Sequence, residues 1–234
     1  MNYTVKINEV NNKESNVKAF ATVVFGESFK ICNIAVVKNK DGNLFVSMPS
    51  YKSNERTEHN EAVFKDVCNP ITAEFQKELS QAILSAYDCR NELGKNALSI
   101  GEPENMGEPE FTVSVTPYKR EGSNIRGLGR IYFEDCFVVS NVSIVQGKNG
   151  MFVSMPSYRT NQQINGKPVY QDICFPVTKE FREKLYDGVL TAYEESKNKV
   201  NEQVQQNLQN APQQSQGMRT VDGKIVQKEE TPFR

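Results

Sequence analysis

The chain begins with three short segments in which Val, Ile, Phe and Thr recur with partial alternation of apolar and polar positions. These segments cover residues 4–10, 17–25 and 29–37. Period-two alternation is typical of strands with one buried face, and the short links between the segments favour an antiparallel meander. A fourth strand is predicted over residues 44–48, because an Asp-Gly turn pair precedes it and Pro49 follows it.

The period changes to that of a helix after Pro70. Thr72 is a favourable N-cap, and Glu74 lies in the first turn, where the helix dipole stabilises a negative charge. The apolar residues that follow recur at spacings of three and four, at Phe75, Leu79, Ala82, Ile83 and Ala86. This spacing predicts a helix of about four turns with one face packed on the sheet. The stretch between Pro49 and this helix predicts a long polar loop.

All of these features occur twice. The segment Leu44-Phe-Val-Ser-Met-Pro-Ser-Tyr51 returns almost letter for letter as Met151-Phe-Val-Ser-Met-Pro-Ser-Tyr158. Residues 4–42 match residues 112–150 without a gap at an offset of 108, and the offset then falls to 107 and to 106 at two single-residue slips. Each copy spans about 85 residues, which is the size of a small domain.

The duplication predicts the domain organisation. Residues 1–88 form a first module and residues 111–196 form a second, each with an antiparallel sheet of about four to five strands followed by a helix, which is an α+β fold. Residues 89–110 contain Gly, Pro and Glu with few apolar side chains and are predicted to be a linker. Residues 197–234 are Gln-rich and are predicted to be disordered, because they offer little apolar surface to bury.

Composition narrows the class of protein. The chain has 234 residues, of which 38% are hydrophobic and 24% are charged. No stretch approaches the roughly 20 apolar residues that a membrane span requires. The first residues also lack the basic and apolar regions of a secretory signal. We therefore expect a soluble, cytoplasmic protein that makes no membrane contact.

The chain offers little material for catalysis. His59 is the only histidine, and the second copy has no counterpart for it. Ser47 and Ser154 recur without a Gly-x-Ser-x-Gly context or a positioned histidine. The segment Gly127-Leu-Gly129 lacks the third glycine of a dinucleotide fingerprint and precedes a predicted strand. We expect no enzyme, no catalytic residue, no cofactor and no small-molecule substrate.

The five cysteines contain no Cys-x-x-Cys pair. Cys68 and Cys174 occupy equivalent positions in the two copies, and both lie in apolar, strand-like runs. This placement favours buried thiols, with a metal site or a disulfide as the alternatives. We expect no metal site.

The net charge of −1 is distributed unevenly. Residues 4–87 carry 10 basic and 10 acidic side chains, whereas residues 112–193 carry 10 basic and 7 acidic ones, so the first copy is neutral and the second is at +3. A protein that holds nucleic acid by charge alone would have a larger basic excess. Any binding of nucleic acid must therefore use a local patch.

The order of these features resembles the SpoVG family in both halves. The specific marks are Leu44-Phe-Val-Ser-Met-Pro-Ser50 with Asp66, Pro70 and Ile71, and Met151-Phe-Val-Ser-Met-Pro-Ser157 with Asp172, Pro176 and Val177. The resemblance implies a small α+β domain that binds DNA and RNA as a regulator linked to septation, sporulation and cell division. Because members of the family have one copy per chain and usually form homodimers, it also implies an intramolecular pseudo-dimer. Further homo-oligomers stay open.

The resemblance also implies where nucleic acid would bind. In the family a basic pair follows Met-Pro-Ser, and this chain keeps its second member as Lys52 and Arg159. The first member is replaced by tyrosine, and Tyr158 beside Arg159 could stack on a base next to a phosphate contact, although packing is an equal alternative.

The family places a second basic pair on the first turns of the helix. The second copy keeps this pair as Arg182 and Lys184, with Lys179 beside it, whereas the first copy has Gln76 and Glu78. We therefore predict a nucleic-acid site formed by Lys52, Tyr158, Arg159, Lys179, Arg182 and Lys184.

Two functions stay open at this point. The first is a regulator that binds DNA or RNA through few phosphate contacts, each of which releases counterions and makes the affinity depend on salt. The alternative is a protein–protein interaction module, in which the first copy completes the fold and the Gln-rich tail, or its end at residues 231–234, recruits a partner. On that alternative the basic residues are ordinary solvated charges.

Overall fold

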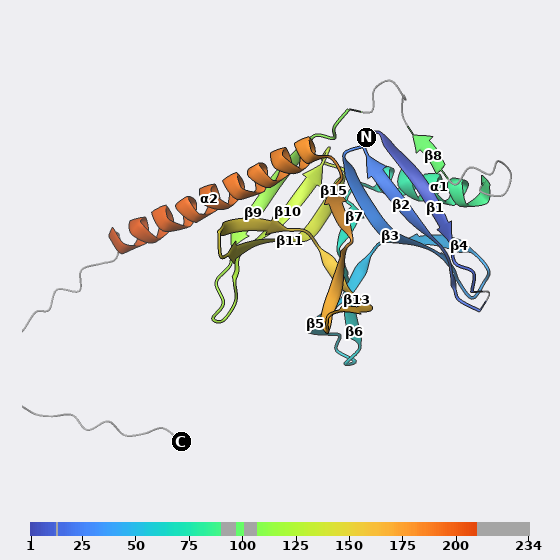
Figure 1. The fold of residues 1–234 in the computed structure, drawn as a ribbon, viewed down its shortest axis with the longest axis horizontal. Coiled ribbons are helices and arrows are strands. Elements are labelled where there is room, and N and C mark those ends of the chain that lie inside the picture. Colours follow the sequence, from blue (N-terminus) through green and yellow to red (C-terminus); the bar gives the residue numbers. More distant parts are fainter. Residues whose placement is uncertain (13, 90–96, 101–106, 210–234) are drawn as a thin grey trace, which may run out of the picture. The chain divides into compact units, whose positions relative to one another are not determined.

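We describe the chain from a computed structural model (Figure 1), in which the described residues are 1–12, 14–89, 97–100 and 107–209. These residues belong to two units, Met1–Lys199 and a second that starts at Val200. Both copies of the repeat lie within the first unit. Most of the predicted linker and the tail from residue 210 lie outside the described residues. In the part of the chain that is described, no helix combines the length and the apolar character needed to cross a membrane.

The first copy contains a four-stranded meander, a two-stranded arm, a short strand and a helix. The meander is β1 (Tyr3–Glu9), β2 (Val17–Phe25), β3 (Phe29–Lys38) and β4 (Leu44–Ser47), and the arm is β5 (Ser50–Arg56) and β6 (Ala62–Asp66). Strand β7 (Cys68–Pro70) and helix α1 (Ala73–Cys89) follow. A further strand, β8 (Ala97–Ile100), lies in the predicted linker and pairs with β1.

The second copy repeats this order. Its meander is β9 (Phe111–Pro117), β10 (Ile125–Phe133), β11 (Phe137–Gly147) and β12 (Gly150–Ser154), its arm is β13 (Ser157–Ile164) and β14 (Lys167–Asp172), and β15 (Cys174–Pro176) and α2 (Lys179–Gln209) follow. Neighbouring strands of each meander pair antiparallel. The predicted α+β fold with two repeated modules is confirmed.

The two copies exchange their short strands. Strand β7 of the first copy pairs with β11 of the second, and β15 of the second copy pairs with β3 of the first. The register places Cys68 opposite Val139 and Cys174 opposite Ile31. Each sheet is therefore completed by a strand of the other module, and the equivalent registers relate the modules as an isologous pair with approximate two-fold symmetry.

A β-bulge in each meander directs a backbone amide towards the other module. Asn33 and Asn141 have φ of 63° and 61°, and the ladder shifts register beside each of them. Asparagine tolerates this left-handed backbone better than most residues, which explains why both copies keep it here. The preceding amides of Cys32 and Ser140 then donate hydrogen bonds to the other copy, over 2.8 Å to the carbonyls of Ile173 and Val67, respectively.

Aromatic rings from both modules form one core. Phe133 lies 4.6 Å from Phe29 and 5.9 Å from Phe25, measured between ring centroids, and Phe137 lies 5.1 Å from Phe25. These four rings are fully buried. Helix α1 reaches the same cluster, because Phe75 packs edge-on against Phe137 at 6.3 Å. The modules thus share a hydrophobic core and do not have two separate ones.

The two helices begin as the sequence predicts. The Thr72 side-chain Oγ accepts a hydrogen bond from the amide of Phe75, and Thr178 caps Phe181 in the same way, each over 3.2 Å. The predicted apolar face of α1 is buried. Helix α2 continues to Gln209, beyond the expected boundary at residue 196, because the Glu, Lys and Gln residues there favour a helix and no proline interrupts them.

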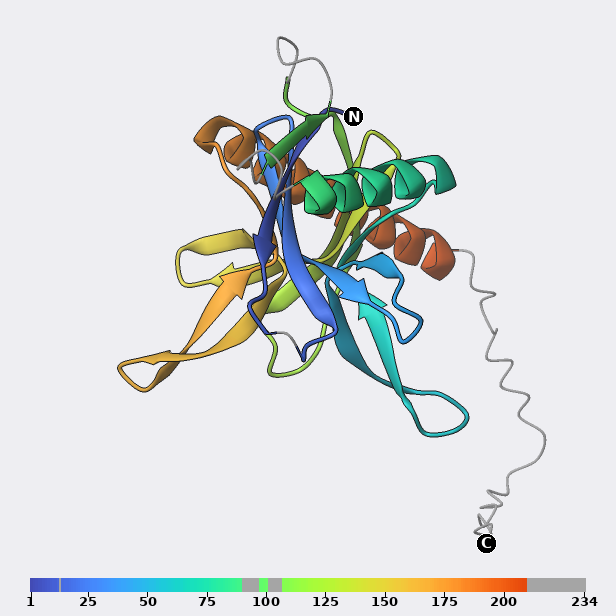
Figure 2. The same cartoon turned by 90° about the vertical axis from the view of Figure 1, so that its right-hand side faces the viewer.

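The long polar loop predicted after each Met-Pro pair is wrong, because the chain forms a β-hairpin arm there in both copies. The two arms project away from α1 (Figure 2). In β5 only Ser53 is buried, and the neighbours on both faces are exposed. A strand with both faces in solvent lacks the apolar alternation that marks a half-buried strand. The Asn165-Gly166 pair, with φ of 50° and 73°, was the available signal for the second hairpin.

Cys68 and Cys174 meet between the modules. Both are fully buried. The interaction with the Cys68 thiol, together with burial, raises the pKa of the Cys174 thiol well above its ordinary value. Both cysteines are free thiols, as the sequence predicts.

Candidate nucleic-acid interface

The residues of the predicted site lie on three elements. Lys52 is on β5 in the first arm, and Tyr158 and Arg159 are on β13 in the second arm. The remaining three, Lys179, Arg182 and Lys184, are on the first turns of α2. All six side chains are exposed.

Each arm places a cation opposite an aromatic ring. Lys52 pairs across the hairpin with Phe64, and Arg159 pairs with Tyr170. Directly opposite residues of a hairpin share one face, so each arm carries a cation and a ring side by side. Phe64 and Tyr170 are 63% and 61% exposed, which leaves both rings open to a ligand.

The opposite face of each arm carries a second tyrosine. Tyr51 pairs across the hairpin with Lys65, and Tyr158 pairs with Gln171. The Tyr158 hydroxyl donates a hydrogen bond of 2.8 Å to the Gln171 Oε1 atom, which fixes the ring against its own hairpin while the ring stays partly exposed. Tyr158 therefore makes a structural contact and still exposes part of its ring to solvent.

The cations of α2 are more engaged than the sequence suggests. The Lys184 Nζ atom lies 3.1 Å from Glu108 and 6.0 Å from the centre of the Phe111 ring. Lys179 forms an exposed ion pair of 3.8 Å with Glu183, one helical turn further on. Arg182 donates a hydrogen bond of 3.2 Å to the carbonyl of Pro176. The two ion pairs offset part of the positive charge that the helix presents to a phosphate, whereas Arg182 keeps its charge and loses one donor.

Arg182 also connects α2 to the base of the second arm. Burial raises the pKa of the Asp172 carboxyl, and the nearby Arg182 guanidinium lowers it in part. Asp172 pairs across the hairpin with Ser157, next to Tyr158. The structure therefore brings Arg182 close to the start of the arm, whereas Lys52 lies on the arm of the other copy.

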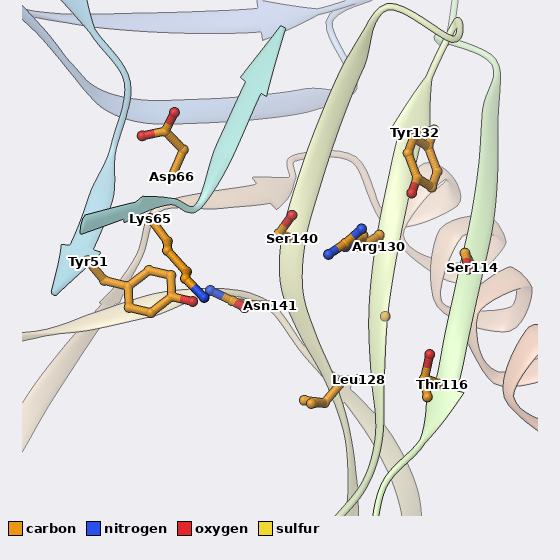
Figure 3. A pocket seen from close by; sticks show the side chains of 11 residues that line it. Tyr51, Lys65, Asp66, Ser114, Thr116, Leu128, Arg130, Tyr132, Ser140 and Asn141 are labelled. Carbon is orange, nitrogen blue, oxygen red and sulfur yellow. The ribbon is translucent and has the colours of Figure 1, made fainter. Parts of the chain in front are cut away.

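Sequence reasoning missed a cleft of about 590 Å³ between the first arm and the second sheet (Figure 3). The arm contributes Tyr51, Lys65 and Asp66, and the sheet contributes Arg130 and Tyr132 together with Ser114, Thr116, Leu128, Gly129, Ser140 and Asn141. Its volume falls in the usual range for ligand sites in proteins. We call it the composite cleft, because neither module forms it alone.

The composite cleft contains two cations and one carboxylate. Lys65 is held by an ion pair with Glu55 on the same arm, and this hydrogen-bonded carboxylate raises the pKa of the lysine. Burial raises the pKa of the Asp66 carboxyl at the base of the arm. Arg130 has no ion pair to any residue in the described part of the chain. Its guanidinium is therefore the cation most available to an anionic group in the cleft.

The equivalent place in the other half is less basic. The repeat offsets put Thr22 at the position of Arg130 and Gln171 at the position of Lys65. Two related surfaces have therefore diverged in charge within one chain. The cleft could not be predicted from either copy, because the long-range exchange of strands positions the first arm beside the second sheet.

Comparison with known proteins agrees with the duplicated architecture. The sequence profile of the SpoVG family matches this chain twice, over residues 1–89 and 110–195. The chain belongs to the SpoVG family. Because the two matches cover both modules and leave out the linker and the tail, the chain contains two SpoVG modules in tandem.

Individual SpoVG proteins resemble one module at a time. The chain is 38% identical to the SpoVG of Phytoplasma australiense over 73 residues, which are 31% of this chain and 71% of the relative. It is 37% identical to the SpoVG of Treponema denticola over 75 residues, 32% of this chain and 75% of the relative. It is 38% identical to the SpoVG of Archaeoglobus fulgidus over 82 residues, 35% of this chain and 91% of the relative. Each of these names includes the term septation.

The structure explains one difference in charge between the helices of the two modules. Glu78 takes the place that Lys184 occupies in the second module, and its Oε1 atom accepts a hydrogen bond of 3.0 Å from the hydroxyl of Tyr3. Tyr3 is fully buried, and burial together with Glu78 raises the pKa of its hydroxyl. The second module has Phe111 in place of Tyr3, and there Lys184 lies near the ring. In each module the helix residue therefore suits its neighbour on the first strand: a carboxylate accepts from a tyrosine hydroxyl in the first module, and a lysine lies near a phenylalanine ring in the second.

Glu78→Lys is expected to lower the free energy of unfolding by about 1–2 kcal/mol, because it removes the acceptor of a buried hydroxyl. The double variant Tyr3→Phe/Glu78→Lys copies the second module and should recover most of that loss. Urea unfolding followed by circular dichroism measures both values. Gln81→Lys, an exposed change on the same helix, should have little effect. Equal destabilisation by the single and the double variant would contradict the coupling.

Proposed function

We propose that this chain is a regulator that binds single-stranded DNA or RNA along its two arms and in the composite cleft. The observation that carries the proposal is the cation beside an exposed ring on each arm, Lys52 with Phe64 and Arg159 with Tyr170. Surfaces that bind single strands combine cations for the phosphates with aromatic rings on which unpaired bases stack. Membership in the SpoVG family supports the same function.

The composite cleft extends this surface towards the second sheet. Tyr51 and Tyr132 offer rings in the cleft, and Arg130 offers an unpaired guanidinium. The serine, threonine and asparagine side chains around them can donate hydrogen bonds to phosphate or sugar oxygens. A single-stranded nucleic acid that contacts the first arm could continue into the cleft, where Arg130 would bind a phosphate.

The ion pairs indicate which of the cations are free to contact a phosphate. Arg130, Arg159 and Lys52 have no ion pair among the described residues, whereas Lys179 and Lys184 do. A phosphate that approaches a paired lysine must compete with its carboxylate. We therefore assign the larger share of binding to the arms and the cleft, and a smaller share to the start of α2. With so few contacts and a net charge of −1, the affinity should fall steeply with salt.

The biological setting of the proposal follows from the family. We propose gene regulation linked to septation, sporulation and cell division, carried out in the cytoplasm by binding and without covalent chemistry. The composite cleft has a carboxylate and hydroxyl groups, but its lining contains no histidine or cysteine. We therefore assign the composite cleft to recognition of nucleic acid.

Fluorescence anisotropy tests the function. Labelled single-stranded DNA, single-stranded RNA and duplex DNA are titrated with the whole chain over a salt series, and single strands are expected to bind best. The triple variant Lys52→Ala/Arg130→Ala/Arg159→Ala is expected to weaken binding by at least about tenfold, because it removes three phosphate contacts. The variant Lys179→Ala/Arg182→Ala/Lys184→Ala should weaken it less.

Lys40→Ala/Lys148→Ala is the control for that experiment. Both lysines are exposed in equivalent meander turns, outside the proposed surface, and the variant loses two positive charges. It should bind almost as the unmodified chain does. Absence of binding to all three nucleic acids at low salt would overturn the proposed function.

A protein partner is the second candidate function. Ile164 at the end of β13 is 65% exposed, and with Phe64 and Tyr170 it gives the arms apolar side chains that a protein could cover. Nucleic acid could still bind after the arm cations are removed. If that binding is then lost in Phe64→Ala/Tyr170→Ala, the result would favour stacking of bases on the two rings. If no nucleic acid binds, the arms become the first surface to test for protein contacts.

A further inference from the structure

The two sheets differ at one edge. In the first sheet, β8 pairs antiparallel with β1, so that β1 has a neighbour on both sides. In the second sheet, β9 is the equivalent of β1 and pairs only with β10 among the described residues. The second sheet therefore ends in an open strand where the first has been extended.

The apolar side chains of β9 are less buried than their equivalents on β1. The inward-facing side chains of β1, Tyr3, Val5 and Ile7, are 0%, 0% and 2% exposed. Their equivalents on β9, Phe111, Val113 and Val115, are only half-buried. Helix α1 contributes to the burial of β1, since it packs against Tyr3, and β1 also has β8 at its edge. A strand added to the open edge of β9 would cover further apolar surface there.

The open edge also presents unpaired backbone groups. At the two ends of β9, the carbonyl of Glu110 accepts from the amide of Glu134 over 3.1 Å, and the amide of Tyr118 donates to the carbonyl of Arg126 over 2.8 Å. The even-numbered residues of β9 thus hydrogen-bond to β10. In an antiparallel ladder the odd-numbered residues then point their amides and carbonyls away from β10. Phe111, Val113 and Val115 offer these groups to a new strand.

The sequence of β9 complements itself. The segment Thr112-Val-Ser-Val-Thr116 reads the same in both directions. When two such strands pair antiparallel about a two-fold axis at Ser114, Thr112 lies opposite Thr116 and Val113 lies opposite Val115. The apolar side chains of both strands then face the same side of the joined sheet. The segment carries no charge, whereas β1 has Lys6 and Glu9, and charges protect edge strands from such pairing.

We propose that two copies of this chain associate through antiparallel pairing of β9 with β9, which joins their second sheets into one. The interface is isologous, because each strand offers the same groups to the other. The association goes beyond nucleic-acid binding and does not depend on it. It would place four arms in one assembly.

Sedimentation velocity of the unmodified chain and of two charged variants of β9 tests the pairing. The unmodified chain should sediment with the mass of two chains. Thr112→Lys/Thr116→Lys places lysine opposite lysine twice, at exposed positions, and should halve the mass. Thr112→Lys/Thr116→Glu places lysine opposite glutamate twice and should restore the dimer. Circular dichroism checks that all three proteins are folded.

A disulfide tests the register. Residues directly opposite in a non-hydrogen-bonded pair have Cα atoms about 4.5 Å apart, which is within the range that a disulfide spans. In a Cys89→Ser background, which removes the exposed thiol, Ser114→Cys should form a covalent dimer on mild oxidation with a copper–phenanthroline reagent. The background alone, and Thr22→Cys in it, should stay monomeric on a denaturing gel.

Several results would overturn the proposal. A monomeric unmodified chain at concentrations of tens of micromolar would do so, and so would a dimer that the lysine pair leaves intact. A monomer whose β9 amides are protected from hydrogen exchange until residues 210–234 are deleted would assign the edge to the chain's own tail. Because the readout is mass, loss of the dimer and loss of nucleic-acid binding are separate results.

Discussion

Phe133→Ala is expected to lower the free energy of unfolding by about 3–5 kcal/mol, the usual cost of truncating a fully buried aromatic ring. The ring has no exposed surface and contacts Phe25 and Phe29, which both belong to the other module. Its loss leaves a cavity at the centre of the shared core. Urea unfolding monitored by circular dichroism measures the change.

The position of Phe133 also predicts how the chain unfolds. Because both modules contribute to its surroundings, the variant should shift one cooperative transition for residues 1–199. Phe152→Ala is the matched control, since this ring is 50% exposed on β12, and it should change the free energy by less than about 1 kcal/mol. Two separate transitions, of which only one moves in the Phe133 variant, would show that the modules have independent cores.

The first module alone, residues 1–89, is expected not to form a folded monomer. Without the second copy, β3 loses its partner strand β15, and β7 has no β11 to join. Phe25 would also lose Phe133 and Phe137, and the freed surface is apolar. The only partners of the right shape are then in another copy of the same fragment.

Two such fragments can restore the exchange between themselves, because β3 and β11 are equivalent in the repeat. The fragment should therefore sediment as a dimer, or lack stable tertiary structure when it is dilute. Sedimentation together with near-ultraviolet circular dichroism distinguishes these states. A folded monomer with native-like stability would contradict the exchange of strands between the modules.

Local patterns in the sequence predict most elements of the fold. Alternation marks the meander strands, and the 3/4 spacing from Phe75 to Ala86 marks α1. The N-caps at Thr72 and Thr178 were readable because their chemistry involves only residues within one turn. The duplication then extended each prediction to the second copy.

The arms and the exchange of strands were outside the reach of such patterns. The arms have solvent on both faces, so nothing selects apolar residues at alternate positions. The exchange pairs β7 with a strand almost 70 positions further on, and local sequence does not specify partners at that distance. The family resemblance supplied the pseudo-dimer, whereas the register that creates it required the structure.

The candidate site, like the fold, could be predicted only in part from the sequence. Sequence reasoning identified Lys52, Tyr158 and Arg159 from the positions that follow Met-Pro-Ser, and the structure places all three on the arms. It gave equal weight to Lys184, which the structure pairs with Glu108 from the end of the linker. It missed Arg130, because this residue gains its setting only when the first arm lies beside the second sheet.

Fusion of two modules in one chain allows the halves to diverge. A homodimer must carry the same residue at both related positions, whereas this chain has Arg130 on one side and Thr22 on the other. Tyr3 with Glu78, and Phe111 with Lys184, show a second divergence that is matched within each module. A single strand bound to such a protein would have a defined direction, because the two arms lead to different surfaces.

Photocrosslinking locates the bound nucleic acid and tests whether it lies along the arms and in the composite cleft. A single-stranded RNA that carries photoreactive bases is bound to the whole chain at low salt, irradiated, and the crosslinked peptides are identified by mass spectrometry. We expect crosslinks to the arms at Tyr51, Phe64, Tyr158 or Tyr170, and to Tyr132 in the composite cleft, all lost at high salt. Crosslinks confined to α1 or to the meander turns, with none on the arms, would contradict binding along the arms.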